Sequence, residues 1–377
     1  MKNERDYVGF KAVKPHLKLL ARTGCFQLTV DARDGKVSHF RRRQFFGWLL
    51  ILIYNMQHVI QVYLTRHSVE KMVDILFMQL TNFNTLSKLI TFIVRLRRIQ
   101  RIIDTANDPY FRPKTQAHLD ILNANEKKTS KVFFYYMLWV FFGCVAFTVN
   151  PIVNKVLDKE ISILLYFPFD TSEILGLCAA TTYLALTLTF VAYSTVVMDC
   201  TVAFFYCQTE AQLKVLRYNI EHFTELDNGV DDGARNVPFM EESMVMNKLL
   251  QNRLVYCVNH YREIIRFITE VESIFSVPIS INFLILVWVI CMTVYKMVGL
   301  DPRSSEFIST IVYLGCMLTE LFLYCYFGTQ LKVESDFVAQ SVYFGGWMKL
   351  SPQFRRQLII LMSCVSKPIM PCASKIV

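Results

Sequence analysis

The chain has 377 residues, of which 53% are hydrophobic and 19% charged, with a net charge of +9 and a mean hydropathy of +0.33. An average soluble domain has about 25% charged residues, so this composition excludes ordinary soluble domains, disordered segments and coiled coils. The 11 cysteines are too sparse for a small disulfide scaffold. The composition therefore indicates an integral membrane protein.

Six apolar stretches are long enough to span a membrane, because a bilayer core about 30 Å thick needs about 20 apolar residues per helix. They are residues 44–64, 72–94, 132–153, 174–198, 276–297 and 307–328. The second is the least apolar, since it contains Asp74, Lys88 and several amides, and it needs protein neighbours on at least one side. We expect an all-α integral membrane protein with six transmembrane helices and cytoplasmic helical extensions.

Basic residues are concentrated in the N-terminal segment, in the segment between the second and third spans, and in the segment between the fourth and fifth. Cytoplasmic loops are enriched in Lys and Arg, so the N-terminus is expected in the cytoplasm. The run Arg41-Arg42-Arg43 directly before the first span is typical of an anchor at the membrane surface. The positive charge therefore predicts contact with membrane lipid and no nucleic-acid partner.

The segments outside the spans divide the chain further. Residues 1–43 are expected to be a cytoplasmic N-terminal segment, 44–205 to hold spans one to four, 206–275 to be a cytoplasmic helical extension, 276–328 to hold spans five and six, and 329–377 to be a cytoplasmic helical tail. Between Leu249 and Phe275 apolar residues recur in steps of three and four, which predicts one face of a helix that continues into span five. Only residues 226–238 have the composition of a flexible linker.

The tail is not predicted to cross the membrane again. The stretch from Val338 to Val365 contains Lys349, Pro352, Arg355 and Arg356 near its middle, and each such charge at mid-membrane costs a few kcal/mol. A helical segment at or below the cytoplasmic surface fits this pattern better.

No motif in the sequence indicates an enzyme. Phosphate-binding loops, HExxH and GxSxG are absent from the sequence, and the seven His do not fall at metal-ligand spacing, so neither a metal nor another cofactor is expected. The charged residues within or beside spans (Asp74, Lys88, Asp199 and Glu320) lie singly, which favours structural pairing inside the bundle over ion transport. A cytoplasmic N-terminus counts against a G-protein-coupled receptor.

Two groups of residues resemble motifs of the insect odorant receptor family. The first is similar to the family's C-terminal signature: Ser341, Tyr343, Trp347, Arg355-Arg356, Lys367-Pro368 and Ala373-Ser374-Lys375. The second is similar to an element before span five: Cys257, His260, Ile264 and Phe267. Pro168-Phe169-Asp170 looks like part of the family's second outer loop. The specific motifs cover only about 60 residues, but the layout of spans agrees over the whole chain.

Two positions depart from the family pattern. Ser374 stands where the family usually has Gly. Family members also continue with a further apolar helix that lines the ion pore, so the resemblance predicts that this seventh, pore-lining helix is missing from the chain. A truncated, non-conducting form that assembles and lowers channel activity therefore stays open as an alternative. A gustatory receptor relative and a transporter remain further alternatives.

The resemblance implies a tuning subunit of an odour-gated, non-selective cation channel, because the long insertion that the co-receptor has between spans four and five is not present. It implies assembly with that co-receptor as a heterotetramer in the plasma membrane of a sensory neuron dendrite. We expect His260, Phe267, Ser341, Tyr343, Trp347 and Pro368, as family-motif residues, to serve subunit assembly.

By the same resemblance, a small volatile binds in the outer half of the membrane among spans two, three, four and six. Apolar and aromatic walls with a few hydroxyl groups suit a ligand held mainly by burial. The expected wall residues are Met72, Leu76, Gln79 and Phe83 of span two, Phe142, Val145, Thr148 and Ile152 of span three, Tyr183 and Thr187 of span four, and Thr310, Tyr313, Leu314 and Met317 of span six. Tyr183 and Tyr313 are the strongest candidates, because a buried phenol needs a hydrogen-bond partner.

Overall fold

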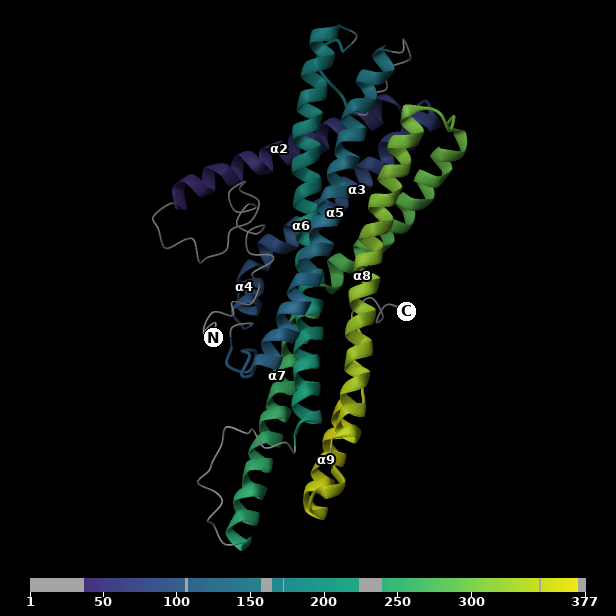
Figure 1. The fold of residues 1–377 in the computed structure, drawn as a ribbon. Helices are drawn as coiled ribbons and strands as arrows, with labels where there is room; N and C mark the ends of the chain where they lie inside the picture. Colours follow the sequence, from purple (N-terminus) through teal and green to yellow (C-terminus); the bar gives the residue numbers. More distant parts are fainter. Residues whose placement is uncertain are drawn as a thin grey trace.

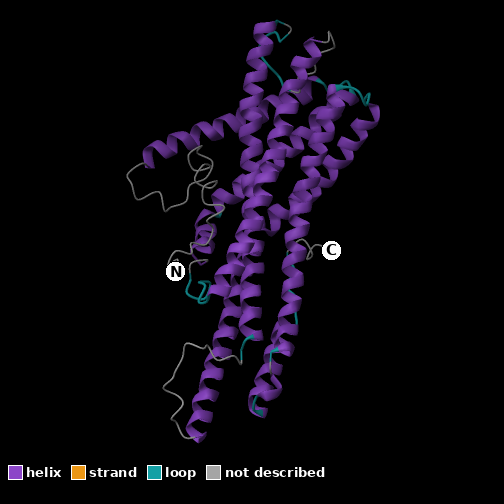
Figure 2. Cartoon of the chain, viewed as in Figure 1, coloured by secondary structure: helices purple, strands orange, loops and turns teal. Residues whose placement is uncertain are grey.

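The computed structural model describes residues 37–371 apart from 106–107, 157–164, 172, 224–238 and 346. Every regular element in these residues is a helix (Figures 1 and 2). The helices are α2 (Val37–Leu64), α3 (Val69–Val94), α4 (Leu96–Thr105), α5 (Gln116–Val156), α6 (Ile174–Glu221), α7 (Phe239–Gly299), α8 (Ser305–Phe344) and α9 (Pro352–Val365), with a single 3₁₀ turn at Trp347–Lys349. The expected linker at 226–238, most of the expected N-terminal segment and the motif residues 373–375 lie outside the described residues.

The all-helical membrane architecture predicted from the sequence is confirmed. Five helices of the described chain are long and apolar enough to cross a membrane: α2 from Phe45, then α5, α6, α7 and α8. The second expected span, α3, is not among them, because its polar side chains lower its hydropathy. It packs instead between protein neighbours, mainly α7, with further contacts to α2 and α6.

Four of the helices extend well beyond the spans predicted from hydropathy. A helix of 61 residues such as α7 is about 90 Å long at 1.5 Å per residue, about three times the thickness of a bilayer core. α5 begins at Gln116 and α6 continues to Glu221, so their polar ends also project past the apolar stretches. Figure 1 shows α5 to α8 running along the length of the molecule while α2 crosses them obliquely.

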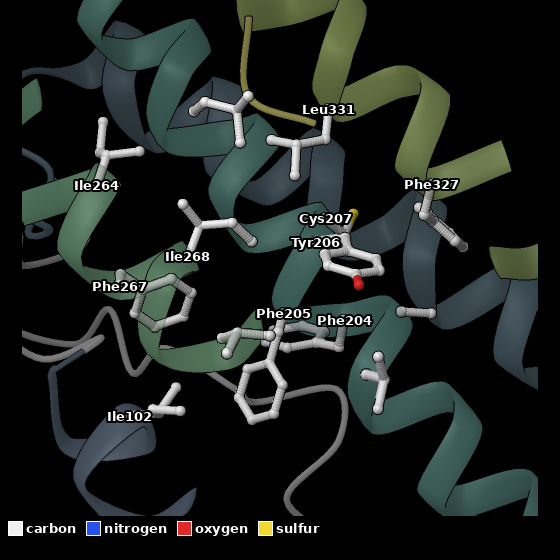
Figure 3. Close-up of a cluster of buried hydrophobic side chains, with 14 of the residues drawn as sticks. Ile102, Phe204, Phe205, Tyr206, Cys207, Ile264, Phe267, Ile268, Phe327 and Leu331 are labelled. Atoms are coloured by element: carbon white, nitrogen blue, oxygen red, sulfur yellow. The ribbon is translucent and has the colours of Figure 1, made fainter. Parts of the chain in front are cut away.

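The largest core begins within the expected spans and continues along the extensions of these helices. α6 is its centre: every residue from Val196 to Leu213 is buried, against α5, α7 and α8. Figure 3 shows Phe205, Phe267 and Leu331, from α6, α7 and α8, pointing into one apolar cluster. The ring centroids of Phe205 and Phe267 are 6.2 Å apart.

The chain turns between α8 and α9 for local reasons. Gly345 ends α8 where a side chain cannot fit, because a Cβ atom there would lie 2.7 Å from the carbonyl oxygen of Ile220. α9 then begins at Pro352, and the hydroxyl of Ser351 accepts a hydrogen bond from the amide of Phe354, which caps the helix. α9 packs against α8, so the stretch from Val338 to Val365 is two helices rather than one continuous helix.

Candidate functional site

A cavity of about 90 Å³ lies between α3, α5, α6 and α8, the helices that contain the expected spans two, three, four and six. Its walls are mainly apolar, with hydroxyl, amide and carboxylate groups at a few points. The lining residues are Met78, Thr81, Asn82 and Thr85 of α3, Tyr136, Val140, Gly143, Cys144 and Phe147 of α5, Leu188, Val191, Ala192, Thr195 and Val196 of α6, and Tyr313, Cys316, Met317 and Glu320 of α8. Apolar walls with a few placed polar groups are typical of small-molecule sites.

Hydroxyl groups join the walls of this cavity across helices. The hydroxyl oxygens of Thr81 and Tyr313 are 2.5 Å apart, and Thr81 donates to the carbonyl of Phe77 at 3.0 Å. Because that bond uses the only hydroxyl hydrogen of Thr81, Tyr313 is the donor between the two. One turn further along α3, the hydroxyls of Thr85 and Thr195 are 2.8 Å apart. These contacts fix α3 against both α8 and α6.

One end of the cavity is an ionic network. The ammonium group of Lys88 lies 2.6 Å from a carboxylate oxygen of Asp199 and 2.6 Å from one of Glu320. Tyr324 donates to the same oxygen of Asp199 at 2.8 Å. All three charged side chains are buried, and Glu320 also lines the cavity. Three of the four charged residues that stand apart in the sequence thus meet in one place, whereas the side chain of Asp74 lies outside the described ones.

Only some of the predicted wall residues face this cavity. Tyr313 and Met317 line it. Phe83, Phe142, Val145 and Ile152 point away from the bundle, with exposed fractions between 40% and 55%. Met72, Leu76, Gln79 and Leu314 are half-buried and do not line the cavity.

The remaining predicted residues are held by their own helix or by α2. Thr148, Thr187 and Thr310 donate to the carbonyls of Cys144, Tyr183 and Glu306, each one turn earlier. The hydroxyl of Tyr183 donates to the side-chain oxygen of Gln57 on α2 at 2.8 Å. Both tyrosines that we singled out therefore have a hydrogen-bond partner, but Tyr183 meets its partner outside the cavity.

Most of the lining residues are not among those predicted from the sequence, although the sequence holds a signal for some of them. Thr81, Thr85 and Lys88 on α3 are spaced by four and three, and Tyr313 and Glu320 on α8 by seven. Polar side chains recurring at such spacings in an apolar helix mark the face that needs protein partners. This spacing indicates the end of the cavity at Glu320.

The family-motif residues do not line the cavity. His260 is buried, and its Nε2 lies 3.0 Å from the side-chain oxygen of Gln212. Ser341 donates to a carboxylate oxygen of Glu221 at 2.7 Å and accepts from Arg217 at 3.1 Å. Phe267 is buried in the main core. The ring centroids of Tyr343 and Trp347 are 6.0 Å apart, and Pro368 is half-buried after α9.

Among the described residues, no group of three or more His, Cys, Asp or Glu side chains is placed to hold a metal ion. The arrangement at the cavity is a small, mainly apolar space between membrane-length helices, with a hydroxyl pair on one side and a charged network at one end. Such a space can enclose a small organic molecule.

Comparison with known proteins identifies the class. Residues 68–377 match the 7tm odorant receptor family, and the chain belongs to that family. It is thus a multi-pass membrane protein and an odorant receptor by family.

Individual relatives agree with this assignment. Odorant receptor 46a, isoform B, of Drosophila melanogaster is 20% identical, with 92% of this chain and 87% of that protein covered. Odorant receptor Or1 of Anopheles gambiae is also 20% identical, over 86% of this chain and 80% of the relative. The olfactory receptor OR5 of Machilis hrabei, solved in complex with eugenol, has the same fold, with a TM-score of 0.77, 17% identity, and 97% of this chain and 92% of that one covered.

Proposed function

We propose that this chain is the odour-binding subunit of a ligand-gated, non-selective cation channel, and that a small volatile binds in the cavity between α3, α5, α6 and α8. The observation that carries the proposal is the cavity itself, which lies among the helices that the family resemblance assigns to odour binding. The chain's similarity to a receptor solved with eugenol, a small aromatic molecule, supports this class of ligand.

The proposal includes a partner and a location. The chain assembles with an odorant co-receptor into a heterotetramer in the plasma membrane of a sensory neuron, with its N-terminus in the cytoplasm. The long extensions of α5 to α8 supply a helical bundle outside the membrane, and its polar and apolar faces are suited to subunit contacts. Gating requires that the bound volatile favours the open state over the closed one.

The test is to express the chain with a co-receptor in a cell that lacks odorant receptors and to record currents with a panel of volatiles. Tyr313→Ala should change the order of potency of the active volatiles, because Tyr313 lines the cavity. Phe142→Ala is the matched control, since Phe142 is an aromatic residue of the same bundle that is 54% exposed on the outside. An altered order of potency with Phe142→Ala but not with Tyr313→Ala would place the binding site elsewhere.

A further inference from the structure

The ionic network at the end of the cavity does not balance. Lys88 supplies one ammonium group, whereas Asp199 and Glu320 supply two carboxyl groups. In the part of the chain that the structure describes, Lys88 is the only cation within ion-pair distance of either carboxylate. Oδ2 of Asp199 is buried and has no hydrogen-bond partner among the described residues. The network therefore has acceptor capacity in excess of its donors.

Part of this excess acceptor capacity lies at the cavity wall, on Glu320. This residue is only 2% exposed, it lines the cavity, and it accepts the hydrogen bond from Lys88 through Oε1. An ionised carboxylate has two oxygens and is an acceptor only. A buried charge needs a compensating partner, so a donor that enters the cavity gains more from Glu320 than from a neutral oxygen.

The hydroxyl groups along the cavity also offer lone pairs rather than hydrogens. Thr81 donates to the carbonyl of Phe77 and Thr195 to that of Val191, and Tyr313 donates to Thr81. Tyr136 also lines the cavity, and its phenol group can either donate or accept a hydrogen bond. The amide on the wall is that of Asn82, whose Nδ2 can donate to a ligand.

Asn82 and the ionic network lie at different depths. Asn82 precedes Lys88 by six residues on α3, which is about 9 Å along a helix. A ligand whose only polar group is a carbonyl can accept from Asn82 but gives Glu320 no donor beyond Lys88. A ligand with a hydroxyl or amino group can satisfy Glu320.

We propose, on the basis of the function proposed above, that the cavity selects small apolar molecules that carry a hydrogen-bond donor, a hydroxyl or amino group, and that the donor binds Glu320. Glu320 is then the residue that determines specificity between alcohols or amines and the carbonyl compounds of the same size.

The test uses sets of probes that differ only in their polar group. Benzyl alcohol, benzylamine and benzaldehyde have the same number of non-hydrogen atoms, as do cyclohexanol, cyclohexylamine and cyclohexanone. The full chain is expressed with a co-receptor, and currents are recorded against concentration for every probe. We expect the alcohol and the amine of a set to be about tenfold more potent than the carbonyl compound, which corresponds to about 1.4 kcal/mol.

Glu320→Gln should reduce this preference to less than about threefold, because the neutral amide no longer supplies a charged acceptor. The variant keeps the size of the side chain and leaves Lys88 paired with Asp199 alone, so the network becomes balanced. Glu306→Gln is the matched control: Glu306 lies on the same helix, pairs with Lys296 at 2.8 Å and does not line the cavity. It should leave the preference as it is.

The outcomes separate the two proposals. If the carbonyl compound of a set is as potent as the alcohol and the amine of the same set, the proposed donor selectivity is overturned, while the proposed function remains. A preference that survives Glu320→Gln would also overturn it, since the selectivity would then arise elsewhere. If these probes are silent while other volatiles of the panel open the channel, the donor selectivity is overturned; if no volatile of the panel opens it, the proposed odour-binding function fails as well.

Discussion

Lys88 of α3 and Asp199 of α6 form a buried ion pair with 2.6 Å between nitrogen and oxygen, although 111 positions separate them in the sequence. The same ammonium group binds Glu320 of α8. A single cation thus joins three helices next to the cavity. Because burying a charge is unfavourable unless it is paired, each of these three groups depends on the others.

Lys88→Met is expected to destabilise the protein severely. The substitution keeps an unbranched side chain of similar length but leaves two carboxylates buried without a counter-charge. Breaking a buried ion pair on one side typically costs about 3–5 kcal/mol. We expect a lower melting temperature of the purified protein in detergent and less receptor at the cell surface, measured by thermal denaturation and by surface labelling.

Arg266→Met is the control for this change, because Arg266 is an exposed basic residue whose contact with Glu263 is 3.8 Å long. Exposed ion pairs contribute about 0–1 kcal/mol, so stability should change little. Equal melting temperatures for the two variants would show that the buried network does not stabilise the bundle.

Gly315→Ala should loosen the contact between α5 and α8. A Cβ atom at this position would lie 2.9 Å from a ring carbon of Trp139, so the indole or the helix has to move. Overpacking of this kind typically costs about 1–3 kcal/mol. Thermal denaturation checks it, with Gly299→Ala as the control, since a Cβ atom there would meet nothing within 4 Å. A melting temperature for Gly315→Ala as high as that of Gly299→Ala would contradict the close approach.

The sequence predicted the helix that precedes the expected fifth span, because polar residues there leave a clear periodicity. The apolar residues found in steps of three and four from Leu250 to Phe275 are all buried or half-buried in α7, and α7 continues without a break into the expected fifth span. In this segment the buried face is apolar and the exposed face is polar, so the two faces differ in composition. A single sequence is enough to see such a difference.

Within the expected spans the same reasoning fails, since lipid and protein interior are both apolar. On α5, Phe142 faces outward and Phe147 lines the cavity, but nothing in their neighbourhood distinguishes them. Periodicity of hydrophobicity therefore cannot select the inner face of a helix that is apolar all round. The pairing of Lys88 with Asp199 and Glu320 is equally invisible, because each contact joins residues more than a hundred positions apart.

Ser341→Ala should weaken the junction between α6 and α8. The hydroxyl of Ser341 lies between Glu221, to which it donates, and Arg217, from which it accepts. A hydrogen bond to a charged group contributes about 1.5–3 kcal/mol, so a loss within this range is expected in thermal denaturation. Ser366→Ala removes an exposed hydroxyl that donates only to the carbonyl of Ser363, and it should be nearly neutral. Comparable losses in both variants would argue against a special role of Ser341.

His260→Ala should destabilise the bundle on the other side of α6. Gln212 donates through its side-chain nitrogen to the carbonyl of Phe111 at 3.1 Å, so its oxygen faces Nε2 of His260, which is the donor. The substitution leaves that oxygen buried without its partner and removes a ring that packs 6.0 Å from that of Phe111. An unsatisfied buried acceptor alone costs about 1–3 kcal/mol.

Two further variants make this prediction specific. His67→Ala should change stability by less than about 0.5 kcal/mol, because His67 is exposed and accepts only from its neighbour Arg66. Gln212→Leu removes the other partner, together with the bond from Gln212 to the carbonyl of Phe111, so the double variant should lose less stability than the sum of the two single losses. Melting temperatures of the single and double variants measure this coupling. If the two losses simply add, the hydrogen bond between His260 and Gln212 does not stabilise the protein, and packing around Phe111 accounts for the effect.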